Sequence, residues 1–255
     1  MSKQLNLWLP SQACTAPLAE DLAVPNVRLM ELERRQQLRH QVEPDSVNLV
    51  GLPTEGRVVL VSKGIWQYRL TLAEAATTEQ VLSALWPTHR EYQVGQKAPE
   101  FLRKTFLPGL NIYCCTGTKD SYLIEARMAP TATEAEADAE IRQKLAAAGL
   151  TPLELTLCRQ VQPPYRSHLA AEALEALVRT CMELTGRGPN LEWYQVANPL
   201  AELDLPNAFA YGSGPLPGSM GPEVQEAQLE GFLLDEAFVQ FILTFARTLS
   251  NFDGG

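Results

Sequence analysis

The sequence has little positive charge: 21 Lys and Arg residues stand against 30 Asp and Glu residues, so the formal net charge at pH 7 is −9. A nucleic-acid-binding surface needs clustered basic side chains, and this balance argues against nucleic acid as a partner. The sequence also lacks an apolar run near the roughly 20 residues of a membrane-spanning helix, which argues against a membrane. Residues Met1–Asn6 contain no apolar signal core, so the sequence predicts a cytoplasmic location.

Histidine is also scarce, with three residues in the whole sequence. His40, His89 and His168 are far apart, and none lies at a helical metal-ligand spacing such as H-E-x-x-H. The five cysteines are an odd number without the spacing of a disulfide framework, so we interpret them as reduced thiols. Cys14 with His40 or His168 would supply a nucleophile and a base, but no local motif supports such a pair, and an incidental thiol is the simpler interpretation.

The middle of the sequence predicts an α+β unit. The 255 residues, 45% of them hydrophobic, suffice for one large domain or two modest ones. Between residues 65 and 160 the pattern predicts strand, helix, strand, strand, helix, strand. Trp66, Tyr68 and Leu70 alternate with polar residues, and Thr77 with Gln80 predicts a capping box at a helix start. This order fits a four-stranded antiparallel sheet with two helices on one face.

The flanking segments predict a second unit of the α/β class. Two apolar strands precede the middle unit, and a helix, two buried strands and a closing helix follow it. The simplest account is a parallel-type α/β domain, residues 1–63 and 162–255, interrupted by an α+β lid domain, residues 64–161. The predicted strands and helices of the flanking unit are Lys3–Leu9, Ser46–Val50, His168–Leu184, Leu191–Val196, Ala208–Gly212 and Leu233–Leu249.

One stretch resembles a zinc-binding motif. Val50–Gly56 reads Val-Gly-Leu-Pro-Thr-Glu-Gly, and the apolar run after it ends in Lys63-Gly64. It resembles the strand end that holds a zinc-binding carboxylate in the zinc-dependent deacylase and exopeptidase family of acetylornithine deacetylase, succinyl-diaminopimelate desuccinylase and related carboxypeptidases. Those enzymes carry Gly-Glu-Pro-Thr there, and their catalytic domain is interrupted by a lid domain. Three further segments, in the family's order, are similar to its lid strand, its hinge return and its glycine-rich turn: Tyr122–Pro130, Pro163–Ser167 and Leu205–Pro215.

The resemblance implies a truncated member whose zinc site is lost. The family's chemistry needs two zinc ions, a bridging carboxylate and a glutamate base. Leu52 stands at the position of the zinc-binding glutamate, and Met220 aligns with a histidine ligand. Matching Leu5–Leu9 to the strand before the family's Asp-Glu-Glu motif places Gln12 and Ala13 at the base and the next ligand. Leucine, glutamine and alanine cannot take these roles, a thioether is a poor zinc ligand, and the family's His-x-Asp motif has no counterpart. We therefore predict no metal and no cofactor.

Two arginines are candidates for contacts to a ligand. In active relatives, arginines near the lid and the hinge hold the substrate carboxylate, a task that suits the guanidinium group. Arg127 and Arg166 are at comparable places in this sequence. The alternative interpretation gives both a structural role at the hinge.

Our leading hypothesis is a catalytically inactive relative of these deacylases and peptidases that acts through protein–protein association, with itself or with an active relative. The lid sheet edge or the lid helix face would form the interface. The alternative is a binding or sensor protein that keeps an amino-acid-like ligand in the interdomain cleft. A residual metallohydrolase is the third hypothesis, so the sequence leaves the question of enzymatic activity open and favours its absence.

Overall fold

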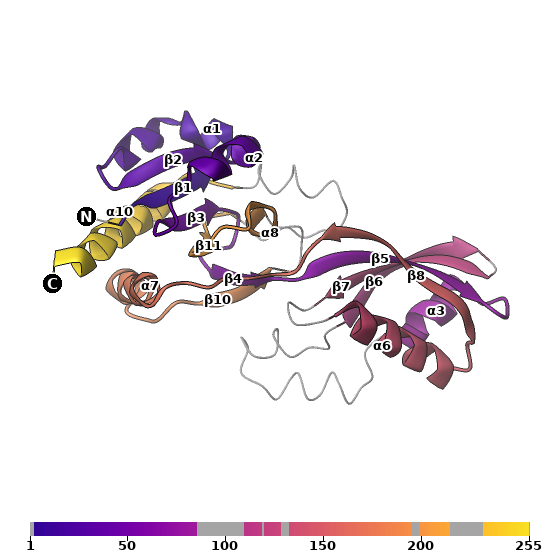
Figure 1. The fold of residues 1–255 in the computed structure, drawn as a ribbon. Helices are drawn as coiled ribbons and strands as arrows, with labels where there is room; N and C mark the ends of the chain where they lie inside the picture. Colours follow the sequence, from indigo (N-terminus) through magenta and orange to yellow (C-terminus); the bar gives the residue numbers. More distant parts are fainter. Residues whose placement is uncertain are drawn as a thin grey trace. The chain divides into compact units, whose positions relative to one another are not determined.

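A computed structural model describes residues 3–85, 110–118, 120–128, 133–194, 199–214 and 232–254. Contacts divide the chain into two compact units: unit 1 comprises Met1–Val61 with Arg166–Gly255, and unit 2 comprises Ser62–Tyr165. Each unit has its own sheet and its own hydrophobic core (Figure 1). Within these ranges, no helix combines the length and the apolar character that crossing a membrane requires.

A mixed sheet forms the centre of unit 1, with strand order β10-β4-β11-β3-β1-β2 and with β9 paired to β4. β2, β1, β3 and β11 run parallel to one another, and β4 is antiparallel to β11. The strands are β1 (Leu5–Leu9), β2 (Val27–Glu31), β3 (Val47–Gly51), β4 (Val58–Ser62), β9 (Tyr165–Arg166), β10 (Leu191–Tyr194) and β11 (Ala208–Tyr211).

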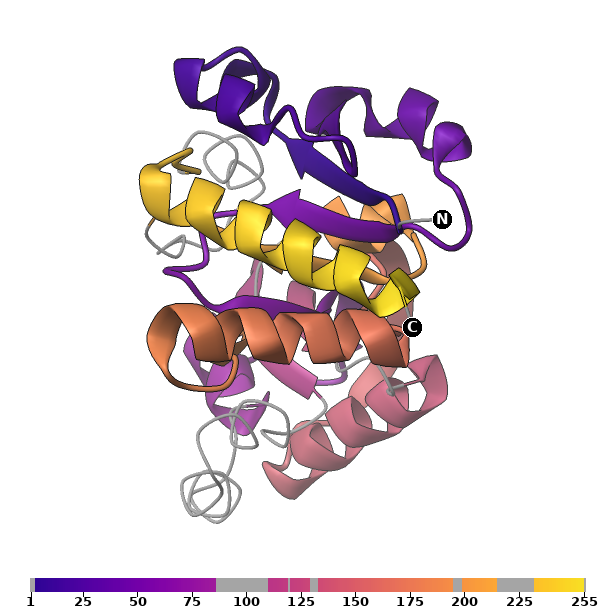
Figure 2. The same ribbon diagram turned by 90° about the vertical axis from the view of Figure 1, so that its left-hand side faces the viewer.

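Two long helices, α7 and α10, lie alongside each other on one face of this sheet (Figure 2). Leu5, Leu7 and Leu9 of β1 point into the core beneath them. Asp235 caps α10 by accepting a hydrogen bond from the Phe238 backbone N–H at 2.8 Å. The helices of unit 1 are α1 (Ser11–Cys14), α2 (Arg35–Leu38), α7 (Ala171–Thr185), α8 (Pro199–Leu203) and α10 (Glu236–Ser250), with 3₁₀ turns at Pro17–Leu22, Leu32–Arg34, Arg39–Gln41 and Asn251–Gly254.

The residues of β1 and β3 that alternate with these apolar ones form a buried polar network. The Asn6 side-chain amide donates to Ser46 Oγ at 2.8 Å and to Asn48 Oδ1 at 3.2 Å. Trp8 Nε1 donates to the same Asn48 oxygen at 3.2 Å, and Asn48 Nδ2 donates to the Pro206 carbonyl at 3.0 Å. Buried polar groups are costly unless paired, so this network favours one register of β1 against β3.

Unit 2 is a four-stranded antiparallel sheet with order β6-β7-β5-β8. Trp66, Tyr68, Leu70 and Leu72 of β5 are buried, and the apolar positions of α3 and α6 belong to the same core. The elements are β5 (Gly64–Leu72), α3 (Thr78–Leu85), β6 (Leu110–Thr118), β7 (Ser121–Met128), α6 (Glu134–Ala147) and β8 (Pro152–Gln162).

The predicted fold class is confirmed: a mostly parallel α/β unit is interrupted by an α+β unit. The predicted capping box is present, because the Gln80 backbone N–H donates to Thr77 Oγ1 at 3.1 Å and the Gln80 side chain accepts from the Thr77 N–H at 2.8 Å. The start predicted for α7 was wrong by three residues. The Ala170 backbone N–H donates to Asn207 Oδ1 at 2.6 Å, which fixes an extended segment before the helix.

Candidate functional site

The carboxyl ends of β1, β3 and β11 meet at one edge of the unit 1 sheet. β2 lies on one side of β1 and β3 on the other, so this edge includes a point where the strand order reverses. Ligands of α/β proteins usually bind in the crevice outside such a point. The residues that follow the three strands are Pro10, Leu52 and Gly212. This edge is therefore where the predicted degenerate site falls.

Apolar side chains fill the space at this edge. A Cβ atom added to Gly51 would lie 2.6 Å from Leu9 Cδ2 and 3.0 Å from the Phe232 ring. A Cβ added to Gly212 would lie 2.3 Å from the Leu52 carbonyl oxygen and 2.8 Å from Phe232 Cε2. Leu52 is 0% exposed and Phe232 5%. The close packing therefore favours glycine at both positions, because a side chain at either one would displace a neighbouring residue.

Backbone hydrogen bonds hold the turn after β3 against the turn after β11. The Leu52 N–H donates to the Tyr211 carbonyl at 3.3 Å, and the Gly212 N–H donates to Thr54 Oγ1 at 3.0 Å. The Thr54 hydroxyl donates to the Arg57 carbonyl at 2.6 Å. These bonds hold the backbone at Leu52 and Thr54 against the turn after β11.

The structure places three of the four predicted site positions. Leu52 is buried at this edge, and Ala13 is buried in the core cluster that includes Leu9 and Phe232. Gln12 is exposed in α1. Met220 lies outside the described residues. Ala13 therefore lies in apolar surroundings and Leu52 is buried, while Gln12 is open to solvent.

The residues at this edge do not fit a zinc pair. A zinc ion needs imidazole, thiolate or carboxylate donors at about 2 Å, and neither leucine nor alanine has such an atom. Across the part of the chain that the structure describes, no three His, Cys, Asp or Glu side chains are grouped so that they could hold a metal. The described donor set thus differs from that of the zinc enzymes which the sequence resembles.

Sequence reasoning missed two carboxylates at the end of β2, Glu31 and Glu33. The backbone N–H and the hydroxyl of Ser11 donate to Glu33 Oε2 at 2.9 and 2.8 Å. Burial, followed by the charges of Glu31 and Glu33, raises the pKa of Cys14 to about 11. Cys14 is therefore a protonated thiol at neutral pH, which argues against a nucleophile. Charged residues at the end of a strand would have indicated these two carboxylates, but the sequence did not predict Val27–Glu31 to be a strand.

The two candidate arginines have different environments. Arg127 of β7, in unit 2, is 2% exposed and forms an ion pair with Glu125 at 2.8 Å. Lys63, in the same unit, is also buried; burial and the Arg127 charge lower its pKa to about 8. Arg166 of β9, in unit 1, is exposed. The buried position of Arg127 suits a structural role, whereas Arg166 is open to solvent.

Comparisons of the structure with solved structures find the same fold in metallopeptidases. An M20 family metallo-carboxypeptidase from Sulfolobus solfataricus is 11% identical, with a TM-score of 0.52 over 98% of this chain and 86% of that one. The aminopeptidase PepT from Bacillus cereus is 9% identical, with a TM-score of 0.53 over 98% and 81%. Human carnosine dipeptidase 1 is 9% identical, with a TM-score of 0.55 over 96% and 80%. No family model and no curated protein matches the sequence.

These similarities agree with the motif resemblance on the fold, since the matched structures are a metallo-carboxypeptidase, an aminopeptidase and a dipeptidase. Identities near 10% demonstrate a common fold and leave the chemistry to the residues of this chain. The protein has the fold of the M20 metallopeptidases, and at the one strand end where its sequence most resembles a zinc-binding motif it has a buried leucine.

Proposed function

We propose that this protein is a non-catalytic relative of the M20-fold peptidases that associates with a second copy of itself through strand β8 of unit 2. The observation that supports this proposal is the exposed edge of β8. A protein without catalytic activity would act by binding a partner, and an open sheet edge offers a surface for such binding. The buried leucine at position 52, which has no atom that can bind a metal, supports the lack of zinc chemistry.

β8 has the length and the exposure of a strand that can accept a neighbour. It spans 11 residues, and in the described sheet it is paired only on the side of β5. Leu153 is 68% exposed and Val161 is 37% exposed. An edge strand presents unpaired N–H and C=O groups that template pairing with another chain. The backbone of β8 therefore offers a ladder of hydrogen bonds to a second strand.

The side chains of β8 suggest which strand that is. Thr71, Arg69 and Gln67, which alternate with the buried residues of β5, pair with Glu154, Thr156 and Arg159. In β8, Leu157 and Cys158 separate Thr156 from Arg159. Leu157 lies opposite Tyr68 of β5 and Cys158 is opposite no residue of β5, so Cys158 is an extra residue in β8. Because of this extra residue, the two charged side chains lie on the same face of the sheet as Thr156.

A twofold axis through Thr156 then brings opposite charges together. In an antiparallel pair of two β8 strands centred there, with Cys158 left out of the register as it is against β5, Glu154 lies opposite Arg159 of the second copy. The same pairing is repeated by symmetry on the other side of the axis. Opposite charges facing each other across two strands stabilise a pair by about 0.2–1 kcal/mol each. The charge pattern is self-complementary, which favours a second copy over an unrelated strand.

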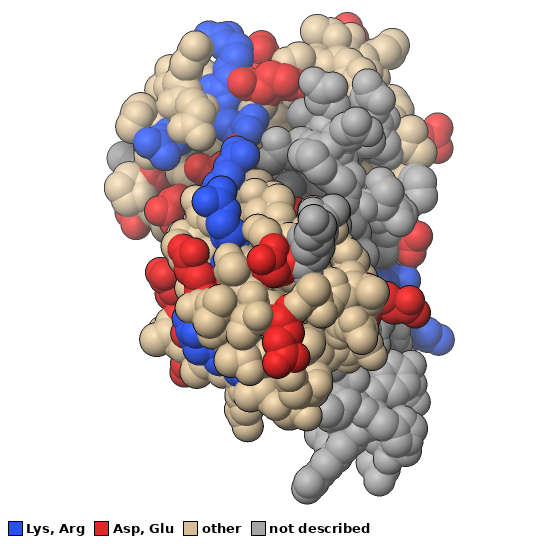
Figure 3. Space-filling model, turned by 90° about the vertical axis from the view of Figure 1, so that its right-hand side faces the viewer, with Lys and Arg blue, Asp and Glu red and all other residues tan. Residues whose placement is uncertain are grey.

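The surface charge also favours a protein partner. On the face shown in Figure 3, basic side chains form a narrow band with acidic side chains on both sides of it. A net charge of −9 would oppose binding to a polyanion such as nucleic acid.

Charge reversal tests the proposal. Glu154→Arg and Arg159→Glu should each weaken self-association about tenfold, because each substitution creates two like-charge pairs in the dimer. The double variant Glu154→Arg/Arg159→Glu restores opposite charges and should recover the wild-type dissociation constant. Sedimentation equilibrium measures all four proteins, and Arg142→Glu, at a half-buried position of α6 whose ion pair with Asp138 is within that helix, is the control.

Two results would overturn the proposal. One is a wild-type protein that stays monomeric across the concentration series. The other is a double variant that associates no better than the single ones, because a purely structural effect of the substitutions would accumulate and would not cancel. Association only after addition of an active M20-fold enzyme would replace the second copy by that relative.

A further inference from the structure

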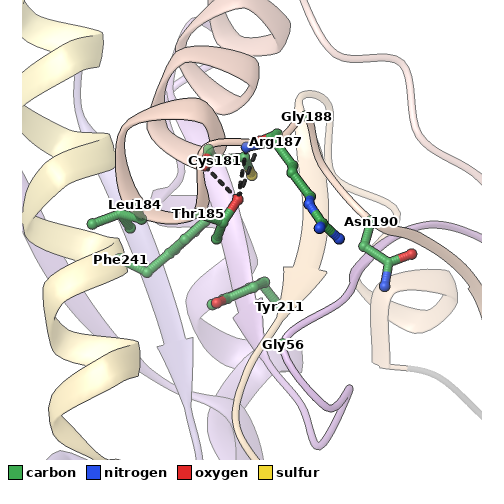
Figure 4. Close-up of a pocket in the computed structure, with 9 residues that line it drawn as sticks. All are labelled: Gly56, Cys181, Leu184, Thr185, Arg187, Gly188, Asn190, Tyr211 and Phe241. Carbon is green, nitrogen blue, oxygen red and sulfur yellow. Dashed lines mark hydrogen bonds between the residues drawn. The ribbon is translucent and has the colours of Figure 1, made fainter.

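A pocket of about 560 Å³ is open to solvent on the surface of unit 1 (Figure 4). The last turn of α7, the loop after it, the end of β11 and the middle of α10 supply its walls. Volumes of this order are typical of sites for small molecules. All of its lining residues belong to one compact unit, so the pocket is a property of that unit alone.

One side of the pocket is apolar and aromatic. The rings of Tyr211 and Phe241 are stacked with their centroids 3.8 Å apart, and Leu184 lies beside Phe241 in the close-up. Burial, with smaller contributions from Cys181 and Asp235, raises the pKa of the Tyr211 hydroxyl, so this side carries no charge at neutral pH. A planar or branched apolar group would find complementary surface here.

The other side of the pocket is polar and basic. The guanidinium of Arg187 and the side-chain amide of Asn190 lie on this side in Figure 4. No described carboxylate forms an ion pair with Arg187, and none of the lining residues is acidic. The loop that presents Arg187 is fixed: Gly186 ends α7 with φ of 68°, and the Arg187 N–H donates to Thr185 Oγ1 at 3.2 Å.

We infer that this pocket binds a small organic monoanion, a carboxylate attached to an aromatic or branched apolar group. Arg187 would hold the carboxylate in the bidentate geometry that guanidinium prefers, with Asn190 as a neutral donor. The apolar group would lie against Phe241 and Tyr211. The final carbonyls of α7 place partial negative charge at this end of the pocket, so a single cation suits a monoanion better than a phosphate dianion.

Binding of 3-phenylpropanoate to the full-length chain tests this inference, with 3-phenylpropanamide and inorganic phosphate as comparison probes. Titration calorimetry and ligand-observed NMR give the affinities. We expect the carboxylate to bind at least tenfold more tightly than the amide, and phosphate more weakly than the carboxylate. Arg187→Gln should remove the preference for carboxylate over amide while both probes still contact the apolar side. Arg179→Gln, which changes an exposed arginine of α7, should leave the preference unchanged.

Equal affinities for the carboxylate and the amide in the wild type would contradict the inference, as would an Arg187→Gln variant that keeps the preference. Absence of binding by all three probes at millimolar concentration would also overturn it. Thermal melting of each variant establishes that it is folded. Arg187 lies in unit 1 and β8 in unit 2, so this experiment and the charge reversal of β8 fail independently of each other.

Discussion

The two units treat buried charge in opposite ways. Around Leu52 in unit 1, the residues that close the ends of the strands are apolar, and the nearby Glu33 accepts its hydrogen bonds from Ser11. In unit 2, Lys63 and Arg127 are both almost fully buried, and Arg127 is paired with Glu125. This fold therefore accommodates buried ions where partners accompany them. Position 52 has no charged group in this sequence, although the fold buries charged side chains elsewhere.

The contrast between the two units is tested most strongly by a carboxylate at position 52, where the zinc enzymes that the sequence resembles have one. Leu52→Glu places an ionisable group at a position where the native side chain is 0% exposed. We expect a loss of roughly 3–5 kcal/mol in the free energy of unfolding, because a buried charge without a partner is strongly destabilising. Urea denaturation measures the change.

Leu52→Met is the control for this substitution, since it keeps an apolar side chain of similar volume and should cost less than about 1.5 kcal/mol. A Leu52→Glu variant as stable as Leu52→Met, or one that acquires bound zinc, would show that the edge is a polar site after all. The contrast between the two units would then be lost.

The buried lysine of unit 2 gives a smaller, pH-dependent effect. The pKa of Lys63 is lowered from 10.5 to about 8, so between these values the unfolded state binds more protons than the folded state. The contribution of Lys63 to stability should therefore rise between pH 8 and pH 10.5, by at most about 3 kcal/mol. Lys63→Met should lack this rise. Denaturation curves of both proteins across this pH range measure the difference, and parallel pH profiles would contradict it.

Much of the fold could be predicted from local patterns. The alternation along β5 and the capping box at Thr77 are short-range signals, and α3 begins directly after the predicted cap. β2 was missed because Val27–Glu31 has no regular burial alternation: only Met30 among its residues is buried. The parallel pairing of β2 with β1 determines its structure, and such long-range pairing leaves little local trace.

The candidate site could be predicted in part. The motif around Leu52 identified a strand end, and the structure places that residue at the carboxyl edge of the parallel strands. The contacts of Phe232 with Gly51 and Gly212 could not be predicted from the sequence. Phe232 follows β11 by 21 positions, and it comes close to the two glycines only in the folded unit. The pocket beside Arg187 had no motif, since its lining residues come from separate elements.

The proposed function requires that this chain does not carry out zinc-dependent hydrolysis. Zinc content of the purified protein, measured by mass spectrometry together with hydrolysis of N-acyl amino acids, tests this most directly. The account predicts substoichiometric zinc and no turnover that a chelator abolishes. Stoichiometric zinc with chelator-sensitive turnover would contradict it.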